Sequence, residues 1–142
     1  MHINFTKLDS ELPPPTRAHA GDAAVDLHCR DGVTLYPGDR RAVDTGIKVA
    51  IPEGYAGFVL PRSGHAKRSG VGVVNSPGLI DSGYRGEVSV LLINHGNDPV
   101  TFRKGDRIAQ LIVLPIPEVE WVEVEELDET TRGEGGFGST GV

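Results

Sequence analysis

The chain has 142 residues, a length typical of one domain, and folding should bury about 65 to 70% of its extended surface. Its formal charge of −6 argues against wrapping a nucleic-acid backbone, because such binding depends on clustered Lys and Arg neutralising phosphates. No apolar run approaches the roughly 18 residues of a membrane span, and Cys29, alone in the sequence, permits neither a disulfide within the chain nor a cysteine-based metal site. The composition therefore predicts a cytoplasmic protein with neither a membrane nor a nucleic-acid partner.

Short apolar runs, separated by nineteen glycines and ten prolines, predict many short strands joined by tight turns. The expected strands are residues 3–8, 33–36, 40–51, 55–60, 87–94, 100–102, 107–114 and 119–124. One short helix is expected at residues 63–68, where Gly64 and Gly70 limit its length. Strands at this spacing are typical of an all-β sandwich, jelly roll or barrel.

The last stretch, residues 129–142, differs from the rest in composition. It contains five glycines, and its only bulky apolar residues are Phe137 and Val142. Such a segment cannot offset the entropy of ordering itself by burying apolar surface. We therefore predict one domain over residues 1–128 and a mobile arm over residues 129–142 that orders when something binds it.

Two segments carry more polar groups than simple turns need. In residues 21–27, Asp22 and Asp26 flank small residues, and taken alone this pattern favours a turn with a capping carboxylate. Residues 61–70 bring Ser and Gly from a strand end into a helix start, where free backbone N–H groups suit phosphate oxygens. Arg62 adds a guanidinium that can bind phosphate in a bidentate manner. A basic surface loop explains residues 61–70 equally well.

A third segment, residues 75–87, places polar side chains around glycine turns between apolar strands. These side chains are Asp81, Tyr84, Arg85 and Glu87. A hairpin that encloses a flat ligand is one interpretation, and a decorated surface hairpin is the other.

Five segments together resemble the five motifs of the trimeric dUTP pyrophosphatase (dUTPase) family, in family order from about Ala18 to the C-terminus. They are Ala23-Ala24-Val25-Asp26-Leu27, Pro61-Arg62-Ser63-Gly64, residues 75–87, Gly105-Asp106-Arg107-Ile108-Ala109-Gln110-Leu111, and Arg132-Gly133-Glu134-Gly135-Gly136-Phe137-Gly138-Ser139-Thr140-Gly141. A chance coincidence of all five is negligible. Ala24 stands where many members have Gly, and His65 where many have Leu; a lone loop histidine is usually a tolerated substitution, so we assign it no role.

The resemblance implies an all-β, jelly-roll-like β-barrel that forms a homotrimer with a mobile C-terminal arm. Each of three active sites would combine motifs from different subunits, and the arm would cross to a neighbour and close over bound nucleotide. The implied reaction is hydrolysis of dUTP to dUMP and pyrophosphate, by Mg²⁺-assisted attack of water on the α-phosphorus.

The resemblance also assigns roles to the residues of the first four motifs. Asp81 would act as the general base on the attacking water, and Asp26 would hold Mg²⁺ through coordinated waters. Asp22 lies outside the matching core and is interpreted as a turn residue. The residues expected to bind the phosphate chain are Arg62, Ser63, Gly64 and Gln110.

Selection of the base and sugar would depend on the hairpin and the arm. The hairpin after Asn75, including Ile80, would pair with the edge of uracil, and Tyr84 would leave no room for a 2′-hydroxyl. From the arm, Arg132 would reach the γ-phosphate and Phe137 would stack on uracil. Gly138 and Ser139 would complete the contacts, with Ser139 bound to a phosphate oxygen.

Two alternatives remain at this point. The related dCTP deaminases share the fold, but their usual Arg-Ser-Ser loop is absent, because Pro61-Arg62-Ser63-Gly64 has the phosphohydrolase form. The second alternative is a nucleotide-dependent interaction protein, in which dUTP closes the arm and the closed trimer binds a regulatory protein partner.

Overall fold

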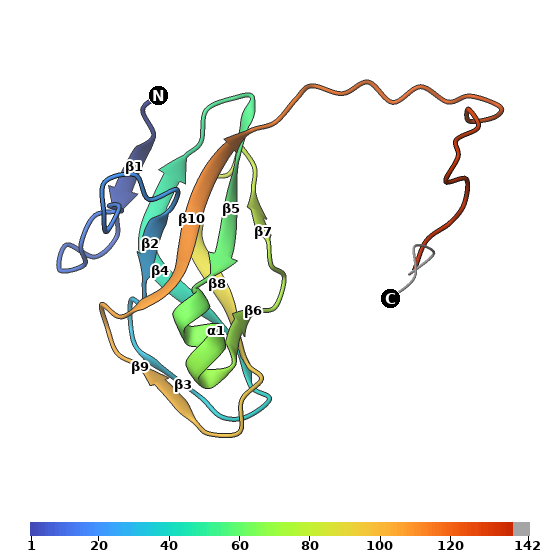
Figure 1. The fold of residues 1–142 in the computed structure, drawn as a ribbon. Coiled ribbons are helices and arrows are strands. Elements are labelled where there is room, and N and C mark those ends of the chain that lie inside the picture. Colours follow the sequence, from blue (N-terminus) through green and yellow to red (C-terminus); the bar gives the residue numbers. More distant parts are fainter. Residues whose placement is uncertain (138–142) are drawn as a thin grey trace.

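Residues 1–137, which the computed structural model describes, form two four-stranded antiparallel sheets, a two-stranded ribbon and one short helix (Figure 1). The first sheet has the strand order β1 (Asn4–Lys7), β4 (Arg40–Ala50), β8 (Glu87–Asn94) and β6 (Val71–Val73). The second has the order β2 (Val25–His28), β10 (Arg107–Pro115), β5 (Tyr55–Pro61) and β7 (Gly78–Ile80). The ribbon pairs β3 (Val33–Leu35) with β9 (Val100–Phe102), and α1 (Ser63–Ser69) follows β5.

The chain crosses repeatedly between the two sheets. From β4 to β8, each successive strand lies in the sheet opposite to the one before it, and β10 returns to the second sheet after the ribbon strand β9. Crossing connections of this kind are typical of a jelly roll rather than of a simple meander. The predicted all-β, jelly-roll-like architecture is therefore confirmed, and so is the short helix after β5.

The core lies between the two sheets and follows the two-residue period of the strands. On β8, the alternate residues Val88, Val90 and Leu92 are buried. Buried residues from β4, β5 and β10 complete it, among them Val43, Val49, Val59, Ile108 and Leu111. Burial raises the pKa of the Cys29 thiol, which packs in this core as a small apolar group.

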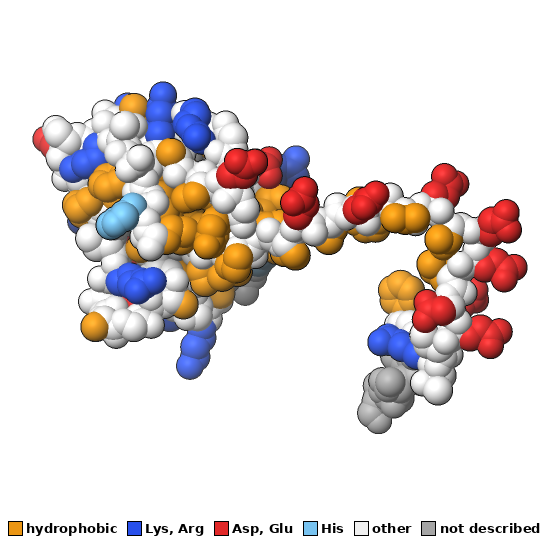
Figure 2. Space-filling view, turned by 90° about the horizontal axis from the view of Figure 1, so that it is seen from above, with side chains coloured by type: hydrophobic (Ala, Val, Ile, Leu, Met, Phe, Trp, Pro, Cys, Tyr) orange, Lys and Arg blue, Asp and Glu red, His pale blue; other side chains and the backbone are white. Residues whose placement is uncertain are grey.

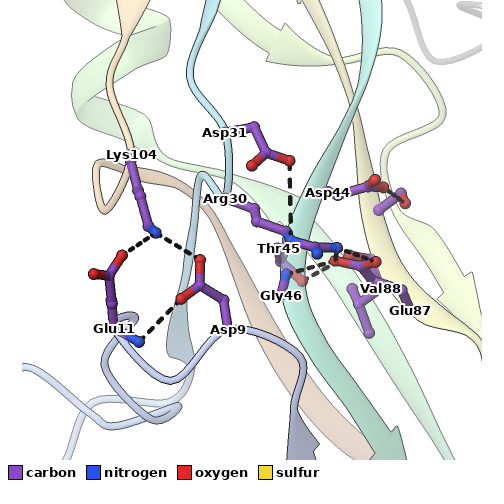
Figure 3. Close-up of polar contacts among 11 residues, drawn as sticks. Asp9, Glu11, Arg30, Asp31, Asp44, Thr45, Gly46, Glu87, Val88 and Lys104 are labelled. Carbon is purple, nitrogen blue, oxygen red and sulfur yellow. Dashed lines mark hydrogen bonds and ion pairs between the residues drawn. The ribbon is translucent and has the colours of Figure 1, made fainter.

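An ion cluster fixes the N-terminal segment to the barrel (Figure 3). The Lys104 ammonium contacts the carboxylate of Asp9 at 2.7 Å and also that of Glu11, and these hydrogen bonds raise the pKa of Lys104 to about 12. Beside the cluster, the side chain of Leu12 is buried against Gly46 of β4. A Cβ at Gly46 would stand 2.7 Å from Leu12 Cδ1, and its φ of +71° is a left-handed value, so this position requires glycine.

One predicted strand, residues 119–124, is wrong. The last strand ends at Pro115, and the chain beyond it extends away from the barrel without regular secondary structure as far as residue 137 (Figure 1). Val119 and Leu127 are exposed, and Trp121 is 94% exposed. The alternating pattern suits a strand, but a strand also needs a neighbour to receive its backbone hydrogen bonds, and residues 1–137 of this chain provide none there.

Asn94 offers a test of how the loops at one end of the barrel are held. It is fully buried; its Nδ2 donates to the carbonyls of Leu35 and Asp98, and its Oδ1 accepts from the Gly96 amide. Asn94→Ala should lower the free energy of unfolding by about 2 to 3 kcal/mol, because it leaves buried polar groups unpaired. The matched variant Asn97→Ala, at an exposed position, should change it by less than about 0.5 kcal/mol. Urea unfolding at equal protein concentrations measures both, and equal stabilities would contradict the assignment.

Candidate active site

The helix α1 begins directly where β5 ends, and its start carries no side-chain cap. Its N-cap residue, Arg62, has an extended backbone and makes no capping hydrogen bond with its side chain. The first N–H groups of a helix generally have no acceptors within the helix, and the Ser63 and Gly64 amides of α1 precede the first bonded amide, that of His65. They are therefore available to an external acceptor. The helix ends at Gly70, which is left-handed and whose Cβ would stand 2.7 Å from the Gly96 nitrogen.

The carboxylate of Asp26 lies between two guanidinium groups. Asp26 Oδ1 is 3.0 Å from Arg62 Nε, and Asp26 Oδ2 is 3.4 Å from Arg107 Nη1. The Asp26 side chain is only 15% exposed, which reduces screening of both pairs by water. Asp26 is also opposite Gln110 in the register of β2 and β10, and Gln110 Nε2 donates to the Pro61 carbonyl at 3.0 Å. Residues from three separate motifs therefore meet at one place.

These side chains line an open, polar cavity of about 560 Å³, which we call the phosphate cavity. Five residues expected to bind phosphate or metal line it, namely Asp26, Arg62, Ser63, Gly64 and Gln110. The cavity also includes Asp22, whose carboxylate accepts a hydrogen bond from the His19 amide at 2.8 Å. That contact confirms the interpretation of Asp22 as a turn residue, although its side chain also faces the cavity.

The electrostatics of the phosphate cavity favour an anionic ligand. Burial lowers the pKa of His28, on β2 beside Asp26; the Asp26 carboxylate opposes this shift, while Arg107 and Arg62 add to it. His28 is therefore neutral at neutral pH, and one Asp26 carboxylate faces two guanidinium groups. The excess positive charge at this cluster suits phosphate oxygens, and guanidinium groups bind them with paired hydrogen bonds.

Two arginines that line the phosphate cavity, Arg68 and Arg107, were given no role by the sequence reasoning. A signal existed for Arg68, because it follows Gly64 by four residues on α1 and residues so spaced share one helix face. Its guanidinium lies 3.4 Å from the position that a Cβ on Gly64 would occupy. Arg107 stands inside the fourth motif, three residues before Gln110, where strand alternation alone does not say which face it joins.

Residues 75–87 do not form the expected hairpin, because β7 lies in the second sheet and β8 in the first, and the two strands do not pair. This connection between β7 and β8 forms a second cavity of about 260 Å³, which we call the hairpin cavity. Asn75, Ile80, Asp81 and Tyr84, all expected at the nucleoside or the attacking water, line it. Val88, Ser89 and Leu91 of β8 also line it and were not expected from the sequence. The alternation of β8 is a usable signal for Ser89 and Leu91, because it turns both away from the core.

Hydrogen bonds within residues 81–87 close the turn that leads from β7 to β8. The Tyr84 hydroxyl donates to the Glu87 carbonyl at 2.8 Å. The Arg85 guanidinium donates to the carbonyls of Ser82 and Tyr84 at 2.6 and 2.7 Å. Asp81 remains exposed at the end of β7, so its carboxylate is free to meet a ligand.

Figure 3 shows how the start of β8 is fixed to β4 beside the hairpin cavity. The Glu87 carboxylate accepts hydrogen bonds from the Gly46 amide at 2.8 Å and from the Arg30 guanidinium at 3.0 Å. The pairing of β4 with β8 shifts register at this point, and the Glu87 carboxylate fills the gap in the ladder. Two residues further along β8, Ser89 hydrogen-bonds Asp44. These contacts hold β8, which lines the hairpin cavity, in place against β4.

A single chain does not bring Asp81 together with the residues of the phosphate cavity. Asp81 lines the hairpin cavity and also a further cavity of about 490 Å³. Tyr55, Ile116 and Glu118 also line this further cavity, at the place where the chain leaves β10. Neither of these cavities shares a lining residue with the phosphate cavity. The general base and the phosphate ligands expected from the sequence are thus on separate surfaces of one subunit.

The arm residues also lie apart from both cavities. Arg132 Nε donates to the Gly135 carbonyl at 2.8 Å within the arm, and Phe137 is fully exposed. Figure 2 shows acidic and hydrophobic side chains interspersed along the extended segment that leads from the barrel to the arm. Gly138 and Ser139, which were also expected to contact nucleotide, lie outside the described residues.

Comparison with known proteins places this arrangement in a family. A family model described as dUTPase matches residues 10–141. A deoxyuridine 5'-triphosphate nucleotidohydrolase of Nocardia farcinica is 55% identical over 140 residues, covering 98% of this chain and 85% of that protein. The enzyme of the same name from Mycobacterium sp. (strain JLS) is 57% identical over 141 residues, covering 95% of this chain and 92% of that protein.

Solved structures agree with the sequence comparisons. The dUTPase of Staphylococcus bacteriophage 80alpha, determined with dUPNHPP, matches with a TM-score of 0.91 and 30% identity over 99% of each chain. A dUTPase variant from phage phi11 of S. aureus, described with a structural Mg(II) ion, matches with a TM-score of 0.82 and 26% identity, covering 89% of this chain and 98% of that one. The chain therefore belongs to the dUTPase family.

Proposed function

We propose that the protein hydrolyses dUTP to dUMP and pyrophosphate, lowering dUTP and supplying dUMP for thymidylate synthesis. The observation that carries this proposal is the phosphate cavity, where Arg62, Arg107, Ser63 and Gln110 gather around one carboxylate at the uncapped start of α1. The two named relatives are 55% and 57% identical to this chain over most of its length. Both are named as nucleotidohydrolases of deoxyuridine 5'-triphosphate. Both features favour hydrolysis at phosphorus over deamination of dCTP.

Within the phosphate cavity, Arg62, Ser63, Gly64 and Gln110 bind the triphosphate chain. The guanidinium group neutralises charge that accumulates on the phosphate oxygens in the transition state, and positioning supplies most of the remaining rate enhancement. The Gln110 amide already has one of its hydrogens bound to the Pro61 carbonyl, which orients the side chain before nucleotide arrives. Asp81 acts as the general base, because an exposed carboxylate accepts a proton from water and no other carboxylate lines the hairpin cavity in residues 1–137.

The residues of the phosphate cavity fit Mg²⁺ bound together with nucleotide. Among residues 1–137, no three His, Cys, Asp or Glu side chains form a metal site by themselves. Mg²⁺ does not need such a cage, because it keeps several waters and takes its other ligands from one or two carboxylates and substrate phosphates. Asp26, which lines the cavity between Arg62 and Arg107, would hold Mg²⁺ through water. Bound Mg²⁺ supplies charge neutralisation on the triphosphate.

We also propose that the working form is a homotrimer in which each site combines parts of different subunits. The separation of Asp81 from the phosphate cavity supports this, because one chain alone cannot place its base and its phosphate ligands on one substrate. The segment between β10 and the arm supports it as well: Val119, Trp121 and Leu127 are exposed where the chain leaves its own barrel. Packing of these side chains against a neighbour would remove a large apolar area from water.

Selection of uracil and deoxyribose belongs to the hairpin cavity. Its backbone between Asn75 and Asp81 would pair with the uracil edge, and unmatched buried polar groups would reject cytosine. Tyr84 is held in place through its hydroxyl bond to Glu87, so its ring forms a fixed wall against a 2′-hydroxyl. Phe137, from the arm, would cover the base by stacking.

A substrate panel tests the proposed function. With Mg²⁺, dUTP should yield dUMP and pyrophosphate in equal amounts, whereas dCTP, dTTP and UTP should react at least about 100-fold more slowly, as expected of a site that rejects unmatched polar groups. Ammonia release from dCTP would instead support the deaminase alternative. A protein that co-purifies only in the presence of nucleotide would add the interaction function, which is compatible with catalysis.

No helix within residues 1–137 is both long and apolar enough to cross a membrane. We propose a cytoplasmic location, where dUTP is available.

Closure of the arm on nucleotide gives a prediction for limited proteolysis. Arg132 is exposed in the free chain, so trypsin should cleave after it readily. With saturating α,β-imido-dUTP and Mg²⁺, Arg132 gains a charge-assisted contact and Phe137 a stacking surface. Cleavage should then slow at least about five-fold, since opening of the arm must overcome these contacts of about 1 to 3 kcal/mol. Cleavage after Arg17, measured in the same digest, serves as the control. Equal cleavage at Arg132 with and without the analogue would contradict arm closure.

A further inference from the structure

His65 makes a specific contact outside its own helix. Its Nε2 lies 2.7 Å from the carbonyl oxygen of Arg107 at the start of β10. A carbonyl only accepts hydrogen bonds, so Nε2 carries the proton and donates. The ring of His65 also stands edge-on to the ring of Phe102 on β9, with the centroids 5.0 Å apart and the planes at 89°. Both contacts fix the orientation of a side chain that the sequence alone left without a role.

This contact closes a ring of four residues around the phosphate cavity. His65 binds the backbone of Arg107, the Arg107 side chain pairs with Asp26, and Asp26 pairs with Arg62. The ring returns to its start through the first turn of α1, where the His65 amide donates to the Arg62 carbonyl at 3.0 Å. We call these four residues the arginine brace. Every link in it is a hydrogen bond or an ion pair, and every member belongs to the walls of the phosphate cavity or contacts a residue that does.

We propose that His65 and Arg107 are positioning residues that set the direction of the Arg62 guanidinium toward the triphosphate of bound nucleotide. This inference rests on the proposed function. His65 fixes the backbone of Arg107, Arg107 holds one oxygen of Asp26, and the other oxygen of Asp26 then receives Arg62 at a defined angle. An arginine held in this way loses less side-chain entropy when it binds phosphate than a freely rotating one.

The position of Arg107 in the sheet explains why it needs the additional contact. The register of β10 on β2 shifts between Arg107, which is opposite His28, and Ala109, so the regular ladder is interrupted directly after Arg107. Half of the Arg107 side chain is exposed, and its distance of 3.4 Å to Asp26 is long for an ion pair with hydrogen-bond character. The His65 hydrogen bond holds the backbone that carries this weakly held side chain.

Three variants and a control test the brace. His65→Leu removes the donor but keeps an apolar contact with Phe102, and His65→Gln keeps an N–H donor at similar reach. Arg107→Met removes the guanidinium. His95→Leu is the matched control, because His95 is an exposed histidine that lines none of the three cavities. Each protein is assayed for kcat and KM with dUTP, and for binding of α,β-imido-dUTP and of dUMP by calorimetry.

His65→Leu should weaken binding of the imido analogue about five-fold, the equivalent of one hydrogen bond, and leave binding of dUMP unchanged, because dUMP lacks the β- and γ-phosphates. His65→Gln should recover at least half of the loss, and His95→Leu should match the parent. In an Arg107→Met background, His65→Leu should have less than about a two-fold further effect, since both substitutions break the same chain of contacts.

Equal weakening of analogue and dUMP binding by His65→Leu would overturn the inference, because it would indicate a general structural defect. Analogue binding equal to that of the parent, or full additivity with Arg107→Met, would overturn it too. The parent protein separates this inference from the proposed function: a parent that neither binds the analogue nor hydrolyses dUTP refutes the function, whereas an active parent with an unaffected His65→Leu variant refutes the brace alone.

Discussion

Asp81→Asn should lose about 10² to 10⁴-fold in turnover of dUTP while keeping its affinity for the nucleotide, since general-base catalysis typically contributes that much. The substitution changes no side-chain hydrogen bond within residues 1–137, because Asp81 is exposed and only its backbone carbonyl is bonded, to the Tyr84 amide. The fold and the hairpin cavity should therefore survive. Steady-state hydrolysis and calorimetric binding of α,β-imido-dUTP give the two quantities.

The control for this experiment is Asp98→Asn, an exposed carboxylate that lines none of the three cavities. It should retain turnover within about two-fold of the parent, as most surface substitutions do. An Asp81→Asn variant that hydrolyses dUTP within a few-fold of the parent would show that another group activates the water.

Mixing two inactive variants should restore activity if each site is built from several subunits. One variant is Asp81→Asn, which has an intact arm, and the other is a chain cut before Thr130, which has an intact Asp81. When a site takes its base from one subunit and its arm from another, random 1:1 mixing gives a complete pair in about one quarter of sites. Each variant alone has none, so the expected gain over either is large.

The measurement is dUTP turnover after partial unfolding and refolding of the mixture, with subunit exchange verified by native mass spectrometry. A mixture of the cut chain with the parent, treated in the same way, shows how much activity the refolding step itself removes. Verified mixed trimers without activity above the separate variants would mean that each subunit carries a self-contained site.

The fold could be predicted to the extent that local patterns decide it. The two-residue alternation of Glu87–Asn94 marks both the strand and its buried face, and that face forms the core. Val71–Val73 and Gly78–Ile80 lie outside the predicted strands, because three-residue strands flanked by glycine and proline have too few residues for a period. Residues 119–124 show the opposite failure, since their alternation is clear but no strand in the described part of the chain, residues 1–137, pairs with them.

The candidate site could be predicted in its members but not in its arrangement. Short motifs indicated Asp26, Arg62 and Gln110, and β-pairing brings all three to one cavity. No motif says that Asp81 lies on another surface of the subunit, because distance between strands depends on how the sheets cross. The role that we propose for His65 depends on a hydrogen bond to the backbone carbonyl of a residue 42 positions away. Because every residue has a backbone carbonyl, the sequence does not indicate which one accepts this bond.

Hydrolysis of dUTP in water enriched in oxygen-18 tests the central claim most directly. With Mg²⁺, the protein should release dUMP that carries one labelled oxygen on its phosphate and pyrophosphate that carries none, because water attacks the α-phosphorus. Mass spectrometry of the separated products distinguishes the two positions. Label in pyrophosphate, or release of inorganic phosphate with dUDP in place of dUMP, would contradict the account.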